Sequence, residues 1–478
     1  MRSLFIGQNI RKHVAAGAAA LCVVCAPVAA VAESLADALA GAYTHSGLLD
    51  QNRALLRAAD EDVAVAISRL RPVLQWSSDI TRTFGENYSF GTTGPAGTAG
   101  IARLDSTLGL SAEMLLYDGG RTKLGADAAK ETVLATRQSL VSIEQSILLR
   151  AVQAFMDVRA TAEIVALRQN NIRVITEELR AAQDRFEVGE VTRTDVALTE
   201  ARLAGARSLL AQAQGDYSIA VEAYQAYVGR APGKLAPPPA MKLPVASVDA
   251  AKAQAMKLHP SLKQAQHQVA AADIGVEIAK RATMPRVTLN GTVGSSSRAN
   301  SPYWQDTGTI GLRASGVIYQ GGQLRALTRK AVAERDAARG ALHDARSEIR
   351  QNVGGAFARV KVAQAALTAT DEQIRAARVA FQGVREEAAL GSRTTLDVLN
   401  AEQELLDAQA NRISAASNEY VAYYSLLASM GLLTVDQLNL KVTRYDPAEY
   451  YNLVHKAPSA LSKQGKKLDK VLQRLGKE

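Results

Sequence analysis

The chain has 478 residues and a formal net charge of +9, and its only two cysteines are Cys22 and Cys25. A basic chain can indicate nucleic-acid binding. Here residues 441–478 hold nine Lys/Arg against four Asp/Glu, so most of the excess lies in one tail, which we expect to be solvated. No nucleic-acid motif accompanies the tail, and the two cysteines cannot build a disulfide framework through the body of the chain.

Residues 1–32 are typical of a secretory signal peptide. Three basic residues precede an apolar run over residues 14–31, which closes with the small-residue site Ala30-Val31-Ala32. A transmembrane anchor is the alternative, but a glycine and a proline interrupt the run. Cleavage would start the mature chain at Glu33 and remove both cysteines, whose preceding residues are a poor context for lipid attachment.

Two pairs of strands follow, the first after a helix expected from Glu33 to Arg71. Apolar and polar residues alternate in four segments, which is the strand signal: residues 74–81, 107–116, 287–293 and 309–318. A polar loop joins each pair, and the first hairpin loop is eleven residues longer than the second. Strands of about ten residues with this alternation match those of a membrane barrel. A soluble hairpin with one polar face is the alternative.

The alternation assigns side chains to two faces of these strands. We expect one set to face lipid: Leu108, Leu110, Met114, Leu289 and Leu312. We expect another set to face water: Glu113, Asn290 and Arg313. Four strands cannot close a barrel, and an open sheet edge is not viable in lipid. A barrel built from them must therefore be shared between protomers.

A long helix is predicted over residues 121–187. Apolar residues recur every seven positions, as at Leu148 and Phe155 in one seam and at Ile172 and Leu179 in a second, and no proline interrupts the 67 residues. This repeat predicts a left-handed coiled coil, roughly 100 Å long. The same seam returns from Val353 to Phe381, and residues 117–120 and 188–196 find matches 202 positions later. We interpret this as an internal duplication.

Shorter helices are expected after each long one. They run from Asp195 to about Val228 and from Asp397 to about Met430, each after a glycine turn. A proline-rich segment ends the first, and helix resumes from Ser247 to Lys280.

Catalytic signals are missing from the sequence. It has no phosphate-binding glycine motif, no metal-spaced histidine pair and no nucleophile elbow. We therefore expect no enzyme, no catalytic residues, no cofactor and no bound metal. Function is expected to depend on shape and on a few polar turns.

The strand pairs that end in Tyr-x-Gly-Gly, the heptad helices and the Gly-x-x-Thr-x-x-Asp-Val turns together resemble the TolC family of outer-membrane export channels, alphaproteobacterial members in particular. The resemblance covers Glu33 to about Leu440. It implies a mainly α fold with a membrane β-barrel. Three protomers would form a homotrimer, each giving four strands to a twelve-stranded barrel that continues into a coiled-coil α-helical tunnel.

The resemblance also implies a location, partners and a division of the chain. The protein would lie in the outer membrane of a Gram-negative bacterium and extend into the periplasm. It would contact outer-membrane lipid, a periplasmic adaptor (membrane fusion) protein and an inner-membrane transporter, for multidrug efflux or type I protein secretion, and no nucleic acid. The expected segments are a signal peptide (1–32), a first repeat (33–229), a proline-rich equatorial segment (230–247), a second repeat (248–431), and an equatorial segment with the basic tail (432–478).

The resemblance also implies roles for two sets of residues, which match motif positions of the TolC family. The adaptor-docking tips are Val188, Gly189, Leu390 and Gly391, although the glycines would be needed for the turns in any case. The gate residues are Thr194, Asp195, Arg393 and Asp397. The resemblance implies that Thr194 and Asp195 bond across to Arg393 of the second tip, and that Asp397 constricts the pore. Two positions depart from the family: Ala388 replaces a gate tyrosine, and Asn400 replaces a second acidic ring.

Two other functions fit a helix-rich exported chain. One is a structural or adhesive coiled-coil protein, and the other is an adaptor-like periplasmic protein, since adaptors also contain helical hairpins. Neither carries two matched pairs of membrane strands, so we expect the export channel.

Overall fold

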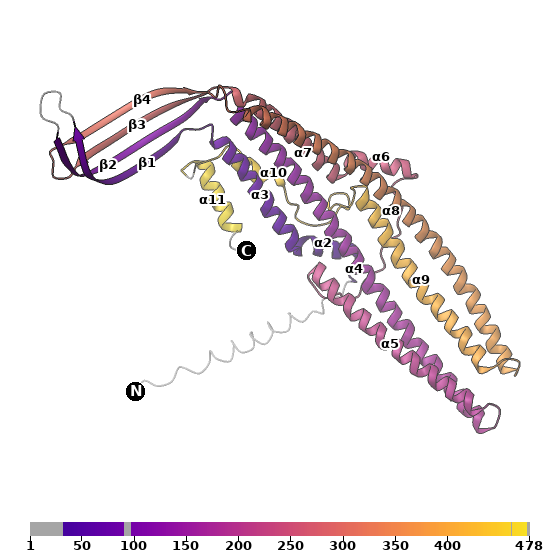
Figure 1. Ribbon diagram of the computed structural model, residues 1–478. Coiled ribbons are helices and arrows are strands. Elements are labelled where there is room, and N and C mark those ends of the chain that lie inside the picture. The colour runs from indigo at the N-terminus through magenta and orange to yellow at the C-terminus, as the bar shows by residue number, and fades with distance from the viewer. Residues whose placement is uncertain (1–31, 90–96, 460, 476–478) are drawn as a thin grey trace, which may run out of the picture. The chain divides into compact units, whose positions relative to one another are not determined.

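The computed structural model describes residues 32–89, 97–459 and 461–475. The predicted signal peptide up to residue 31, with Cys22 and Cys25, lies outside the described residues. The chain divides into two compact units, and Figure 1 labels the helices and strands that they contain. Unit 1 holds residues up to 46, 147–243 and 361–423, and unit 2 holds 47–146, 244–360 and 424 onwards.

The described elements follow one another in a mainly helical chain with four strands, as predicted. In order they are α2 (Leu35–His45), α3 (Gly47–Ser68), β1 (Val73–Ser89), β2 (Gly97–Tyr117), α4 (Arg121–Glu187), α5 (Arg193–Val228), α6 (Val248–Leu258), α7 (Pro260–Lys280), η1 (Arg281–Thr283), β3 (Arg286–Arg298), β4 (Trp304–Ser315), α8 (Gln323–Ala389), α9 (Thr395–Ser429), α10 (Pro447–Val454) and α11 (Lys463–Leu475).

The two long helices are confirmed. Helices α4 and α8 each have 67 residues, and both ends of α8 lie 202 positions after those of α4. Leu148 and Phe155 of the predicted seam are fully buried, as is Val353 of the second copy. The shorter helices α5 and α9 begin two residues earlier than predicted.

Two predicted helices are each broken into two. The helix expected over Glu33–Arg71 is interrupted at Ser46, whose ψ of 104° is extended, ahead of the poor helix former Gly47. The helix expected over Ser247–Lys280 is interrupted at His259, because the proline that follows it disfavours helical backbone at the preceding residue.

The strands form one antiparallel sheet in the order β1-β2-β3-β4. Strands β1 and β2 have 17 and 21 residues and are longer than the ten-residue prediction, because residues 82–89 and 97–106, which were expected outside the strands, belong to β1 and β2. Strand β4 ends at Ser315, so Ile318 lies outside it.

The register confirms the predicted separation of the two faces. Met114 pairs with Leu289, which pairs with Leu312, so the three side chains share one face. On the opposite face Ser111 pairs with Thr292 and Thr292 with Thr309, and the two threonine hydroxyls are 2.6 Å apart. The apolar face is open: Leu312 is 70% exposed.

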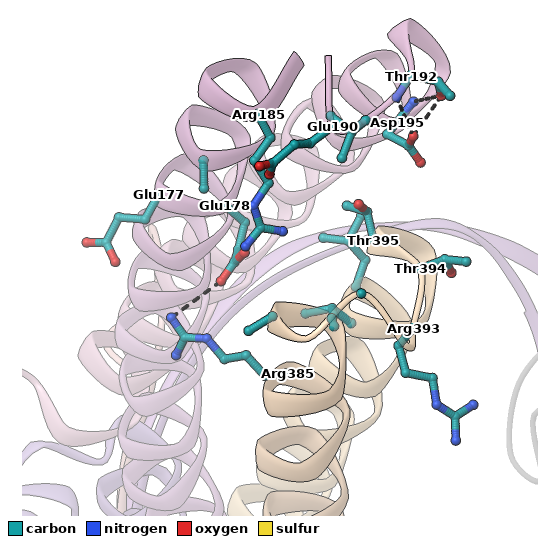
Figure 2. A pocket seen from close by; sticks show the side chains of 17 residues that line it. Glu177, Glu178, Arg185, Glu190, Thr192, Asp195, Arg385, Arg393, Thr394 and Thr395 are labelled. Carbon is teal, nitrogen blue, oxygen red and sulfur yellow. Dashed lines mark hydrogen bonds and ion pairs between the residues drawn. The ribbon is translucent and has the colours of Figure 1, made fainter. Parts of the chain in front are cut away.

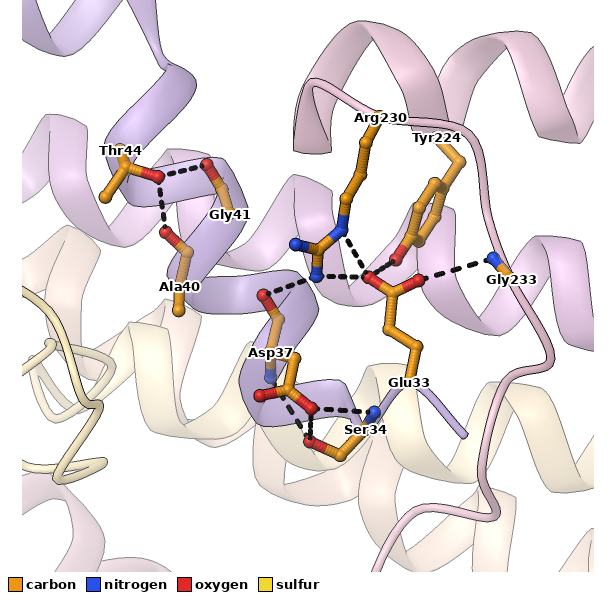
Figure 3. A network of polar contacts seen from close by, with 9 residues as sticks. All are labelled: Glu33, Ser34, Asp37, Ala40, Gly41, Thr44, Tyr224, Arg230 and Gly233. Carbon is orange, nitrogen blue, oxygen red and sulfur yellow. Dashed lines mark hydrogen bonds and ion pairs between the residues drawn. The ribbon is translucent and has the colours of Figure 1, made fainter. Parts of the chain in front are cut away.

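A polar network ties the start of the described chain to the segment after α5 (Figure 3). The Glu33 carboxylate accepts hydrogen bonds from the Tyr224 hydroxyl at 2.7 Å and from Arg230 Nε at 2.9 Å. Burial raises the pKa of Tyr224, and its bond to Glu33 adds to the rise. These contacts fix the proline-rich segment that begins after Gly229.

The described part of the basic tail is folded and partly buried, contrary to the fully solvated tail that its charge suggested. Tyr450 and Val454 of α10 are buried, and the Tyr450 hydroxyl donates to Glu61 of α3 at 2.7 Å. A count of charged residues could not predict that these apolar positions are buried.

Among the described residues, none of the helices combines the length and hydropathy needed to span a bilayer.

Candidate functional site

The site is built from two helical hairpins, α4–α5 and α8–α9, whose tips belong to unit 1. Each long helix ends in the same turn. Gly189 has a φ of +79° and its N–H donates to Phe186 O, while Glu190 N–H donates to Arg185 O. Gly391, with a φ of +78°, repeats the pattern in the second hairpin. This is a Schellman motif, in which only glycine adopts the left-handed position without strain.

The tips expose apolar side chains beside these glycines. Val188 is 71% exposed and Leu390 is 84% exposed. Each lies directly before the reversal of the chain, where no neighbouring helix of the same chain covers it. The two positions therefore form the apolar docking candidates that the sequence predicted.

Asp195 and Asp397 start the returning helices through matched capping boxes. Asp195 Oδ2 accepts from the Thr192 hydroxyl at 2.7 Å and from Thr192 N at 2.9 Å. Asp397 Oδ2 accepts from the Thr394 hydroxyl at 2.8 Å and from Thr394 N at 3.0 Å. These hydrogen bonds favour the carboxylate form.

The hydrogen bonds also set the charge of both groups. The Thr192 side chain and then its backbone N–H lower the pKa of Asp195. The backbone N–H and then the side chain of Thr394 lower the pKa of Asp397. Both carboxyl groups are therefore ionised at neutral pH.

The predicted bond from Arg393 to Thr194 and Asp195 is not made within the described part of this chain. Arg393 Nε donates instead to Glu387 of its own hairpin at 2.8 Å, and this pairing raises the pKa of Arg393. Arg393 and Thr194 are both exposed.

A groove of about 780 Å³ separates the two tips. Asp195 lines it from the first hairpin (Figure 2). Ala388 lines it from the second hairpin. The small side chain at position 388 leaves open a space that a larger residue would occupy.

Several polar contacts join the described parts of the two hairpins, and the sequence predicted none of them. Arg168 of α4 lies 3.9 Å from Asp407 of α9. Glu178 Oε1 of α4 lies 3.6 Å from Arg385 of α8 (Figure 2). Asn171 of α4 donates to Glu402 Oε1 of α9 at 2.9 Å, and Arg202 of α5 donates to Asn400 of α9 at 2.8 Å.

Glu402 is the most perturbed of these groups. It is 7% exposed, and burial raises its pKa to about 7. The hydrogen bond from Asn171 acts in the opposite direction, as does the charge of Arg385, while Glu178 raises the pKa further. The available sequence signal was Asn171, a polar residue next to Ile172 in the heptad repeat. This signal does not identify Glu402 as the partner of Asn171.

Comparisons with known proteins agree with this architecture. Residues 41–230 and 252–432 match the family model described as outer membrane efflux protein. The outer membrane efflux protein BepC of Brucella suis is 35% identical over 431 residues, covering 89% of this chain and 91% of BepC. The alkaline protease secretion protein AprF of Pseudomonas aeruginosa is 27% identical over 356 residues, covering 72% and 73%.

Solved structures of low identity share the fold. The Campylobacter jejuni CmeC outer membrane channel superposes with a TM-score of 0.73 at 15% identity, covering 88% of this chain and 89% of CmeC. The open state of the Neisseria gonorrhoeae MtrE outer membrane channel gives 0.70 at 20% identity, covering 83% and 88%.

Proposed function

This chain belongs to the outer membrane efflux protein family, and from that membership we propose that it is the passive exit duct of an export system in the Gram-negative outer membrane, gated at its periplasmic tip. The family is one of efflux proteins, and the proposed role needs no catalytic residue. Transport energy would come from an inner-membrane transporter that the duct meets through an adaptor.

The observation that carries the proposal is the two-faced sheet. One face holds exposed apolar side chains such as Trp76 and Ile310, and the other holds Ser111, Thr292 and Thr309. Strands β1 and β4 each have only one neighbour in the sheet. Backbone N–H and C=O groups at such edges must form hydrogen bonds with another strand when the sheet lies in lipid. Three copies joined edge to edge supply them and make a closed barrel of twelve strands with a polar lumen.

The arrangement of repeats supports the same assembly. We infer that residues 33–229 and 248–431 are two copies of one unit, separated by the equatorial segment 230–247 and followed by 432–478. Equal lengths of α4 and α8 and the two separate family matches support this division. Three chains would then place six hairpins around one tunnel.

The gate is proposed to lie where the hairpins approach each other. Glu178–Arg385 and Asn171–Glu402 hold the two hairpins of one chain together. Thr194, Asp195 and Arg393 are proposed to bond between adjacent hairpins, and Asp397 to form a ring of three carboxylates. The tips with Val188, Gly189, Leu390 and Gly391 are proposed to dock the adaptor.

Two classes of cargo are candidates for this duct. BepC is named for efflux and AprF for secretion of alkaline protease, so both multidrug efflux and type I secretion are candidate uses of this duct.

Crosslinking in cells tests the proposed partnership. A photo-reactive amino acid at Val188 should capture an adaptor, while the same group at the exposed shaft residue Glu404 should not. The purified protein should require detergent for extraction and migrate as a heat-modifiable oligomer. A water-soluble chain that is released without detergent would support the structural or adaptor-like alternative.

A further inference from the structure

Helix α11, residues Lys463–Leu475, has two opposed faces. Four lysines fall on one side at spacings of three and four residues: Lys463, Lys466, Lys467 and Lys470. Leu468, Val471 and Leu472 recur at the same spacings on the other side. Such a basic amphipathic helix is the form that lies in a membrane interface.

The two faces differ in how the protein covers them. All four lysines are exposed, and Leu468 and Val471 are half-buried. Leu472 is 45% exposed, and Leu461, just before the helix, is 90% exposed. The apolar side is therefore only partly satisfied by the chain itself.

Hydrogen bonds fix where the helix begins. Arg71 donates to the carbonyls of Lys456 and Ala457, and Pro72 alone separates Arg71 from the first residue of β1. Gln464 of α11 donates to Leu453 O of α10 at 2.7 Å. Both ends of this connection belong to unit 2. The segment leading into α11 is therefore attached beside the start of β1.

We propose that α11 is a lipid-binding helix that docks on the inner phospholipid surface of the outer membrane and binds anionic headgroups through its lysines. The inference rests on the proposed membrane sheet, because β1 starts where the chain enters from the helices, at the periplasmic boundary of the bilayer. Headgroup phosphates complement the lysines, and the acyl boundary takes up Leu472. Peptidoglycan also carries negative charge, but it offers no apolar phase for the second face.

The test uses a solvatochromic dye on Leu472→Cys in the full chain reconstituted into vesicles. Intact mass first confirms that Cys22 and Cys25 have been removed. In phosphatidylcholine vesicles containing phosphatidylglycerol the dye emission should shift to the blue, and in pure phosphatidylcholine it should not. Each lysine near an anionic surface contributes about fivefold to binding. Lys466→Glu/Lys467→Glu/Lys470→Glu should therefore abolish the shift, whereas the equally charged control Lys234→Glu/Lys242→Glu/Lys257→Glu should keep it.

Channel conductance on the same preparations separates this inference from the proposed function. The channel could conduct while the dye emission is equal in vesicles with and without phosphatidylglycerol, or is unchanged in the triple lysine variant of α11. Either result would overturn the binding of anionic lipid by α11 and leave the proposed channel intact. Dye emission that shifts with isolated peptidoglycan and not with anionic vesicles would do the same and favour the cell wall. Loss of both conductance and dye response in a correctly assembled preparation would overturn the proposed channel together with its helix.

Discussion

Asn171 donates a hydrogen bond to Glu402 at 2.9 Å, and both side chains are buried between the first and second helical hairpins. A buried carboxyl in such a contact makes the contact depend on its protonation. The hairpins of the proposed gate are therefore joined by a group that titrates near neutral pH.

Raising the pH from about 4.5 to 7 is expected to loosen this contact. Burial places the pKa of Glu402 at about 7, above its ordinary value of 4.5. The folded contact therefore favours the protonated form, and the cost of ionisation grows from about pH 4.5 to pH 7 and is complete above that. The full cost is on the order of 3 kcal/mol. Channel conductance in planar bilayers should therefore rise between about pH 4.5 and pH 7 and level off above pH 7.

The variant Glu402→Gln keeps an acceptor for Asn171 and removes the titration, so its conductance should be flat over the same range. Glu404→Gln, at an exposed position of the same helix, should titrate like the wild type. An identical pH slope in Glu402→Gln would assign the pH dependence to another group.

Removing the ion pair between Glu178 and Arg385 is expected to raise the conductance of the resting channel. The Arg385 side chain is 63% exposed and that of Glu178 is 23% exposed, so the pair contributes less than about 1 kcal/mol. Arg385→Ala and Glu178→Ala should have similar effects, and the double variant should add little. Arg375→Ala, an exposed arginine on the same helix, serves as the control. Fully additive single effects would mean that the two residues act separately.

Arg393→Ala tests the proposed bond between adjacent hairpins. Among the described residues, Arg393 forms its ion pair with Glu387 in an exposed position, so a purely local role predicts unchanged conductance. A bond to Asp195 of an adjacent hairpin predicts an increase that Glu387→Gln does not reproduce. Single-channel recording distinguishes the two.

Asp397→Asn is expected to weaken block by trivalent cations applied from the periplasmic side. Threefold repetition would give a ring of carboxylates that raises the local cation concentration by about tenfold or more. Asparagine retains an oxygen for the Thr394 cap, so the helix start should survive. Asp195→Asn makes the matched change in the other tip and should leave the block nearly intact. Equal loss of block in both variants would place the cation site elsewhere.

Local patterns predicted the elements, because periodicity and capping depend on neighbouring residues. The Thr-x-x-Asp spacing is typical of a helix start, and it occurs at Thr192–Asp195 and at Thr394–Asp397. The sequence alone could not show that each aspartate accepts hydrogen bonds from the threonine of its own turn. The break before Pro260 was equally local and was overlooked. Glu402 and Asn171 are 231 positions apart, and their meeting depends on how two helices rotate against each other. No heptad pattern encodes that rotation for a single polar residue.

The most direct test of the channel is covalent modification of the polar strand face during conductance recording. Ser111→Cys, in a mature chain shown by mass to lack Cys22 and Cys25, should react with a charged, water-soluble thiol reagent and lose conductance in discrete steps. Leu110→Cys, one residue away on the apolar face, should show the same initial conductance and no change on addition of the reagent. Equal responses at the two positions, or a response at Leu110→Cys alone, would contradict an outer-membrane duct lined by this face of the sheet.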